Sequence, residues 1–348
     1  MIEAGRYTSG RIAIANLSAA IASLELRRRE GAGFDDLVAL AKLLFARGDV
    51  LGCVKDHERA EMIGTEAVAM SPASAHALYV RAQLAGRFHR FEEASAILDQ
   101  ALAAGYPQHE IDLERAALLQ AIGLYTDALN LRGQLAKRDP GIQTLGGLAS
   151  LLADMEQWNA ADSTYAAALD ADNSVSPLPC GQLLFEWGVS AMRRGELDRA
   201  EAIFIDLEAV LPARVPGRGH RAEVALARGQ LDIAMALIMP LLRISDDPEY
   251  GAIYAEILSA RGDRKAASEA ERAATAYELL LARRPEAYAD HAAAFFTGVG
   301  KRPQRALELA LINRRLRDTP RARALLIKAQ HSAQQALAMH SSICGTKH

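Results

Sequence analysis

Cysteine, aromatic residues and long apolar runs are all scarce in this sequence of 348 residues. Its three cysteines, Cys53, Cys180 and Cys344, are too few for a disulfide framework. Aromatic residues make up 5% of the chain, whereas a β-sandwich draws on aromatic and β-branched residues. No apolar run approaches the roughly 18 residues that cross a bilayer, so we expect no membrane insertion. The net charge of −3 lacks the basic excess that would indicate nucleic acid as a partner.

Alanine, by contrast, is abundant and recurs at a regular interval. Half of the residues are hydrophobic, and alanine accounts for about one residue in five, a composition that favours closely packed helices. One series of eight alanines is spaced by 33 or 34 residues, apart from two intervals of 39: Ala60, Ala94, Ala128, Ala161, Ala200, Ala234, Ala267 and Ala306. A fixed period of this length is typical of solenoids built from stacked helical units.

A second series of small residues precedes the first, by 12 residues in all units but one: Ala41, Ala82, Ala116, Ala149, Gly188, Ala222, Ala255 and Ala294. Glycines suited to the intervening turn lie at Gly48, Gly123, Gly195, Gly229 and Gly262. With these two series at positions 8 and 20 of a 34-residue unit, the sequence resembles the tetratricopeptide repeat. The resemblance covers roughly residues 34–320, and its closing part, from about Ala282 to Pro320, is similar to stand-alone bacterial repeat proteins without an established role.

This resemblance implies an all-α fold, a right-handed α-α superhelical solenoid of about eight helical hairpins. Each hairpin has a helix A and a helix B that cross closely at positions 8 and 20, and large apolar residues are expected at positions 4, 7, 11, 17 and 24. We expect an N-terminal capping helix in residues 1–33, the repeat array in residues 34–320, and a C-terminal helix with a frayed tail in residues 321–348. The segment VLGCVKD makes the first unit longer, which predicts a longer helix A or a bulging loop.

The resemblance also implies a concave groove lined by the A helices, whose positions 2, 5, 6, 9, 12 and 13 point inward. The inward residues that we expect to contact a protein or peptide partner are Tyr79, Gln83, Arg87, Gln143, Gln182, Phe185 and Arg193. Members that clamp a C-terminal carboxylate use Lys at position 5 and Asn at position 9, and this sequence has neither pattern. The sequence therefore predicts a non-enzymatic protein-interaction scaffold, because it contains no phosphate-binding loop, zinc-protease motif or nucleophile elbow.

The alternative is an accessory subunit of an enzyme or pathway that presents a substrate or handles metal. Thiolate and imidazole groups suit zinc or copper, and they occur four residues apart in Cys53 and His57 and again in His340, Cys344 and His348. Ordinary surface or core side chains explain these residues better than a metal site does, so we expect no metal and no cofactor. The sequence leaves the oligomeric state open. We expect a cytoplasmic location, or a periplasmic one if a signal preceding this sequence has been removed.

Overall fold

The computed structural model describes residues 4–31 and 33–345, with side chains as far as residue 338, and the described residues contain no β-strand. A short 3-10 helix, η1 (Ala4–Arg6), precedes the first α-helix. The α-helices in chain order are α1 (Gly10–Arg29), α2 (Phe34–Leu51), α3 (Val54–Met70), α4 (Ala75–Arg87), α5 (Phe91–Ala103), α6 (Gln108–Ile122), α7 (Tyr125–Arg138), α8 (Ile142–Asp154), α9 (Trp158–Asp170), α10 (Pro177–Arg193), α11 (Leu197–Val210), α12 (Val215–Ala227), α13 (Leu231–Ile238), α14 (Leu241–Ile244), α15 (Pro248–Ala260), α16 (Ala266–Leu281), α17 (Pro285–Thr297), α18 (Pro303–Leu316) and α19 (Pro320–Gly345). No helix in this described part is long and apolar enough to cross a membrane.

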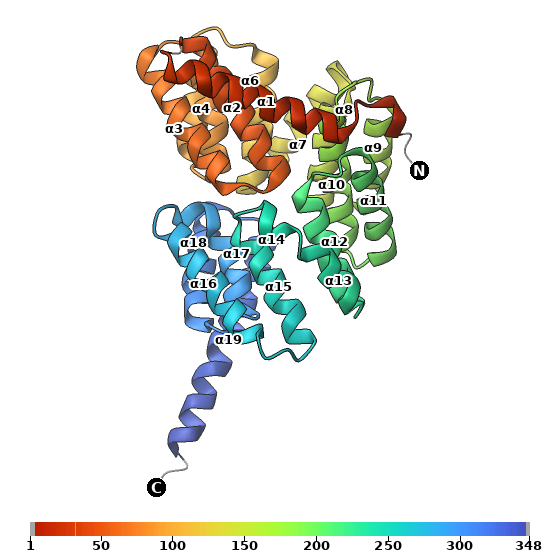
Figure 1. Ribbon diagram of the computed structural model, residues 1–348, viewed down its shortest axis with the longest axis vertical. Helices are drawn as coiled ribbons and strands as arrows, with labels where there is room; N and C mark the ends of the chain where they lie inside the picture. The colour runs from red at the N-terminus through yellow and green to blue at the C-terminus, as the bar shows by residue number, and fades with distance from the viewer. Residues whose placement is uncertain (1–3, 32, 346–348) are drawn as a thin grey trace. The chain divides into compact units, whose positions relative to one another are not determined.

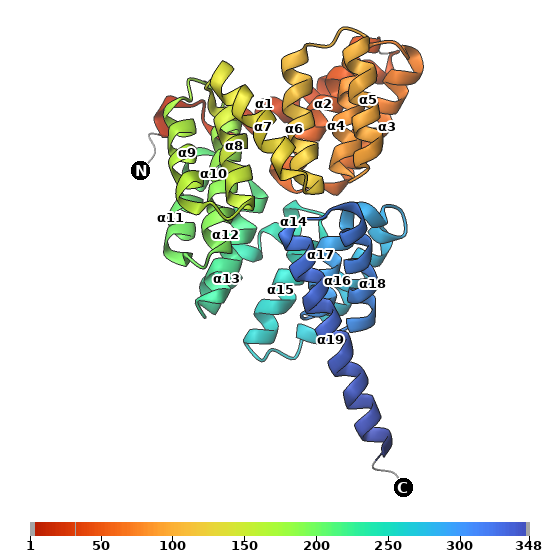
Figure 2. The same ribbon diagram turned by 180° about the vertical axis from the view of Figure 1, so that it is seen from behind.

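The helices follow one another as antiparallel hairpins, which Figures 1 and 2 show from opposite sides. The hairpins are α2–α3, α4–α5, α6–α7, α8–α9, α10–α11, α12–α13, α15–α16 and α17–α18. The all-α solenoid predicted from the alanine period is therefore confirmed, with the expected eight hairpins in the described residues. The first unit is longer because α2 runs for 18 residues. In the sixth unit Pro240 lies between α13 and the short α14, because proline cannot supply the amide that a continuing helix requires.

The small residues at positions 8 and 20 are buried in each of the first six hairpins. In the α6–α7 hairpin, for example, Ala116 and Ala128 are both 0% exposed. In the α10–α11 hairpin a Cβ on Gly188 would lie 2.5 Å from the ring of Phe204. Larger side chains at these positions would force the two helices apart, as the repeat pattern predicts.

In each of the last two hairpins the predicted register holds at one position, where Ala255 and Ala306 are buried, and fails at the other. Ala267 and Ala294, which the alignment assigns to positions 20 and 8, are exposed, whereas Ala270 and Ala293 are buried. The turns of these hairpins contain five residues, 261–265 and 298–302, where the α8–α9 turn contains three. The longer α15–α16 turn moves the buried face of α16 from Ala267 to Ala270, whereas Ala294 precedes the α17–α18 turn and is one residue from the buried Ala293.

One turn glycine is also misplaced by the alignment. Gly48 lies inside α2, where a Cβ would be 2.5 Å from the His57 ring, and the turn glycine is Gly52, with φ 58°. The other four predicted turn glycines all have positive φ values. In two of the remaining turns His89 and Glu156 adopt this left-handed conformation instead, with φ 57° and 60°.

The chain divides into two compact units. Unit 1 comprises Met1–Gly86, Glu92–Gln120 and Leu124–Asp247, and unit 2 comprises Arg87–Phe91, Ala121–Gly123 and Pro248–His348. Unit 1 therefore holds most of the first six hairpins, and unit 2 holds the last two hairpins with α19. The boundaries expected after residues 33 and 320 remain predictions, although α1 ends at Arg29 and α19 begins at Pro320.

The N-terminal segment does more than cover the first hairpin of unit 1. Helix α1 packs against α2 and also against α10. Tyr7 is buried in the apolar core of the α10–α11 hairpin, and its hydroxyl donates a hydrogen bond to Asp172 over 2.9 Å. Burial and the neighbouring thiol of Cys180 raise the pKa of Tyr7, so the phenol stays protonated and remains a donor. The segment thus links hairpins that lie far apart in the sequence.

Candidate binding surface

Inward side chains of the successive A helices of unit 1 (α4, α6, α8, α10 and α12) contact one another in sequence. We call this set of side chains the A-helix face. At its first step, the Gln83 side chain on α4 donates a hydrogen bond of 2.6 Å from Nε2 to Oε1 of Glu114 on α6. The Tyr79 hydroxyl lies 3.4 Å from the same oxygen. These bonds tie α4 to α6 through polar groups.

Asp154 on α8 joins the next A helices, α6 and α10. Its two carboxylate oxygens accept from Gln120 on α6 and from Arg193 on α10, each over 2.7 Å. The Arg193 guanidinium also lies 5.6 Å from the centre of the Trp158 ring, a cation–π geometry. One acidic side chain on α8 therefore connects the A helices on either side of it.

Arg214, at the beginning of α12, makes the contacts that join α12 to α10. Its guanidinium donates to Gln182 Oε1 over 2.5 Å and lies 4.7 Å from the centre of the Phe185 ring. The imidazole of His220 stacks on Phe185 with ring centres 5.4 Å apart. Each pair of neighbouring A helices from α4 to α12 is thus joined by at least one side-chain contact, all within unit 1.

Only some of the seven predicted contact residues take part in these contacts between A helices. Gln83, Gln182, Phe185 and Arg193 belong to the chain of contacts on the A-helix face. Gln143 lies exposed near the start of α8, and Arg87 ends α4 and belongs to unit 2.

Tyr79 was predicted to contact a partner, but its side chain is buried. It is 6% exposed, and its ring stacks on Tyr106 at 4.1 Å between ring centres. Burial raises the pKa of Tyr79. The ring serves the core of the second hairpin, and only its hydroxyl reaches the A-helix face.

Burial also controls the charge of Glu114. Desolvation raises the pKa of this carboxyl group, while the hydrogen bonds from Gln83 and Tyr79 lower it. Because desolvation is the largest of these effects, Glu114 holds its proton more tightly than an exposed glutamate does.

Arg132, like Arg214, is a residue of this surface that the sequence analysis missed. It lies on α7 at position 24, which the repeat normally fills with a large apolar side chain, and it is only 9% exposed. Its side chain reaches α8, where a Cβ on Gly147 would clash with its Nη1 atom. Two signals were present in the sequence: a charged residue at a core position, and the glycine pair Gly146–Gly147 inside an A helix.

The candidate metal ligands do not assemble into a site in the described part of the chain, where no group of three or more histidine, cysteine or acidic residues has metal-binding geometry. His57 is buried and its Nε2 lies 3.0 Å from Asp49 Oδ1. Burial raises the pKa of Cys53, which disfavours the thiolate that a metal requires. The side chains of His340 and Cys344, and the whole of His348, lie outside the described residues.

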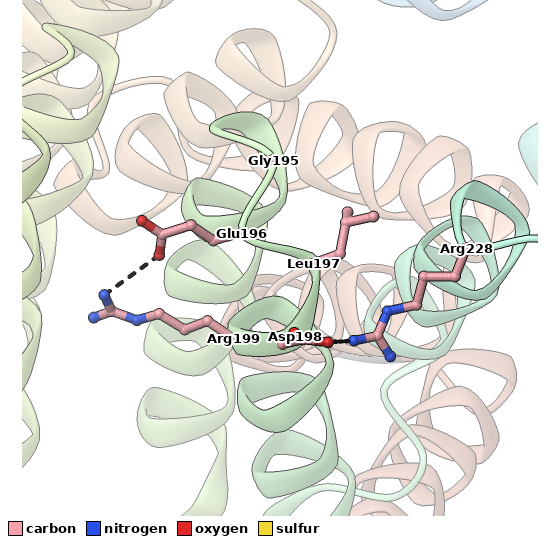
Figure 3. Close-up of a pocket in the computed structure, with 6 residues that line it drawn as sticks. All are labelled: Gly195, Glu196, Leu197, Asp198, Arg199 and Arg228. Carbon is pink, nitrogen blue, oxygen red and sulfur yellow. Dashed lines mark ion pairs between the residues drawn. The ribbon is translucent and has the colours of Figure 1, made fainter.

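A surface hollow of about 540 Å³ lies where the α10–α11 turn faces the end of α12. Figure 3 shows that its charged side chains are paired with one another. Arg199 lies 3.5 Å from Glu196, and Arg228 forms an ion pair with Asp198. Because these charges neutralise each other, the hollow presents no group aimed at a ligand.

No family model and no curated protein matches the sequence. Among solved structures, the chain is similar to the human IFIT1 dimer with PPP-AAAA, at 14% identity and a TM-score of 0.57 over 89% of this chain and 73% of that one. It is similar to the APC/C hetero-tetramer Cut9–Hcn1, at 16% identity and a TM-score of 0.50, covering 85% of this chain and only 55% of that one. It is also similar to a tetratricopeptide repeat protein from Parabacteroides merdae, at 21% identity and a TM-score of 0.45 over 72% of this chain and 92% of that one. The chain therefore has the all-α solenoid fold of tetratricopeptide-repeat proteins.

Proposed function

We propose that this protein is a non-enzymatic scaffold that binds a protein or peptide partner on the A-helix face of unit 1. The observation that carries the proposal is the row of polar and aromatic contacts that joins each pair of neighbouring A helices from α4 to α12. A helical stack needs apolar packing between its helices, but it does not need a row of amide, carboxylate and guanidinium groups. Among the side chains of these A helices, Gln143 and Gln182 are exposed, and we take them as the ones that a ligand reaches first.

The length of the A-helix face favours an extended segment over a small molecule. Neighbouring packed helices lie about 8–10 Å apart, so five successive A helices span about 36 Å. An extended chain rises about 3.3 Å per residue, so a segment of about 11 residues matches this length. Glutamine side chains and partly exposed rings such as Phe185 provide the mixture of hydrogen bonding and apolar area that binds extended peptides.

A peptide selection tests the proposal even though the natural partner is unidentified. Random 12-residue peptides displayed on phage are selected on the full-length protein, and the affinity of the best peptide is measured by isothermal titration calorimetry. We expect Gln143→Ala and Gln182→Ala to weaken binding at least about fivefold, or about 1 kcal/mol, as residues in a contact surface do.

Gln100→Ala is the matched control, because Gln100 is an exposed glutamine on the B helix α5. We expect this variant to bind the peptide like the unmodified protein. Unchanged affinity in both A-helix variants, with their folding intact, would contradict the proposed surface.

A further inference from the structure

The guanidinium of Arg132 lies beside Gly147 on α8, where the A helix itself contributes no side chain. Glu114, Gly147 and Glu186 stand at position 6 of three consecutive A helices, α6, α8 and α10. Gly147 has no side chain, and the Nη1 atom of Arg132 lies directly against it. A side chain from the B helix α7 thus supplies the charge at the middle of this row.

Arg132 nevertheless has no hydrogen-bond partner in the described part of the chain. It is only 9% exposed, and no described residue forms a hydrogen bond or ion pair with it. Its Nε atom is fully buried without an acceptor, which leaves the terminal nitrogens as the donors that can reach a ligand. A buried charged donor without an acceptor is unfavourable, and so it favours any ligand that brings one.

The carboxylates around Arg132 already have their own donors. Glu186, Asp154 and Glu114 all act on the guanidinium through their charge. Glu114 accepts from Gln83, Asp154 accepts from two side chains, and Glu186 accepts from Gln182 over 2.6 Å. These groups supply a negative potential at Arg132 but leave its hydrogen-bonding capacity unused.

We infer that the terminal nitrogens of Arg132 donate hydrogen bonds to a main-chain carbonyl oxygen of an extended peptide lying across α8. A carbonyl fits better than a carboxylate, because three neighbouring carboxyl groups repel a further negative charge at this place. The inference rests on the proposed function and names the atom by which the A-helix face recognises the peptide backbone. It also predicts that bound peptides are neutral or basic near Arg132.

The test uses the best peptide from the display selection and a series of analogues in which one amide at a time is replaced by an ester. An ester carbonyl is a weaker acceptor than an amide carbonyl. We expect Arg132→Met to weaken binding of the parent peptide at least tenfold. We expect one ester analogue to bind several-fold more weakly to the unmodified protein but no more weakly than the parent to Arg132→Met.

The control is Arg138→Met, which removes an exposed arginine from the same helix and should leave affinity unchanged. If Gln143→Ala and Gln182→Ala weaken binding while Arg132→Met does not, the carbonyl contact is refuted and the proposed surface stands. If the selected peptides share an acidic residue that cannot be changed to its amide, Arg132 binds a carboxylate and the inference is refuted. If none of the A-helix variants affects binding, both proposals are refuted together.

Discussion

The contact between Arg132 and Gly147 allows a stability experiment that needs no ligand. Gly147→Ala places a Cβ where Nη1 of Arg132 now lies, so the guanidinium must move out of its place against α8. Alanine would otherwise stabilise the interior of a helix by about 0.5–1 kcal/mol relative to glycine. Forcing the guanidinium into already packed surroundings creates overpacking strain of about 1–3 kcal/mol. We therefore expect Gly147→Ala to destabilise the protein by about 1 kcal/mol.

The same substitution should have the opposite effect when the arginine is shortened. Methionine ends at about the level of the arginine Nε atom, so Arg132→Met leaves the space beside residue 147 empty. In that background we expect Gly147→Ala to stabilise by about 0.5–1 kcal/mol. The coupling energy between the two sites is then about 1.5–2 kcal/mol, within the range measured for contacting residues.

Urea unfolding followed by circular dichroism measures the four variants of this cycle. Arg132→Met alone should not destabilise, because an arginine without a hydrogen-bond partner contributes little to the fold. A coupling energy near zero would refute the placement of the guanidinium against Gly147. A loss of more than about 2 kcal/mol in Arg132→Met would show that Arg132 serves folding rather than recognition.

The remaining predictions concern packing, titration and thiols. Ala128→Leu should destabilise by about 1–3 kcal/mol, because Ala128 is fully buried where α6 and α7 meet, whereas exposed Ala103→Leu should have a much smaller effect in the same urea assay. Burial raises the pKa of Glu114, so its ionisation destabilises the fold as pH rises. Glu114→Gln should therefore be the more stable protein at pH 7, with the difference vanishing below the unfolded pKa of about 4.3; equal stability at pH 7 would contradict this. Burial and Arg317 lower the pKa of His89 to about 4. The resulting stability is present above the unfolded pKa of about 6.5 and is lost as pH falls towards 4, by up to about 1.4 kcal/mol per pH unit. His89→Asn, which tolerates the positive φ, should flatten the pH dependence in that window; an unchanged slope would exclude this histidine as its source. Titration with a thiol reagent under denaturing, non-reducing conditions should find all three cysteines free, and a single free thiol would indicate a disulfide.

The fold was predictable because its main steric requirement leaves a visible mark in the sequence. Alanine recurs wherever two helices of a hairpin touch, and Ala116 and Ala128 are buried as that pattern requires. The prediction fails at Ala267 because the length of the preceding turn varies without a signal in the alanine series, and it fails at Ala294 by a single residue. A period alone cannot detect that the five-residue turn before α16 shifts the buried face of that helix.

The candidate surface was only partly predictable, because register fixes the direction of a side chain but not its partners. Tyr79 lies at an inward position, yet Tyr106 from the following loop covers its ring. Arg132 was overlooked because position 24 belongs to the core, and only the structure shows its side chain reaching α8 beside Gly147. A residue that crosses from one helix layer to the other depends on three-dimensional contacts that spacing does not encode.

The structure of the full-length protein in complex with its selected peptide is the most direct measurement of the central claim. The account predicts that the peptide crosses α4, α6, α8 and α10 on the A-helix face, with one of its main-chain carbonyl oxygens about 2.9 Å from a terminal nitrogen of Arg132. A peptide bound instead against the B helices α5, α7 and α9 would contradict the account.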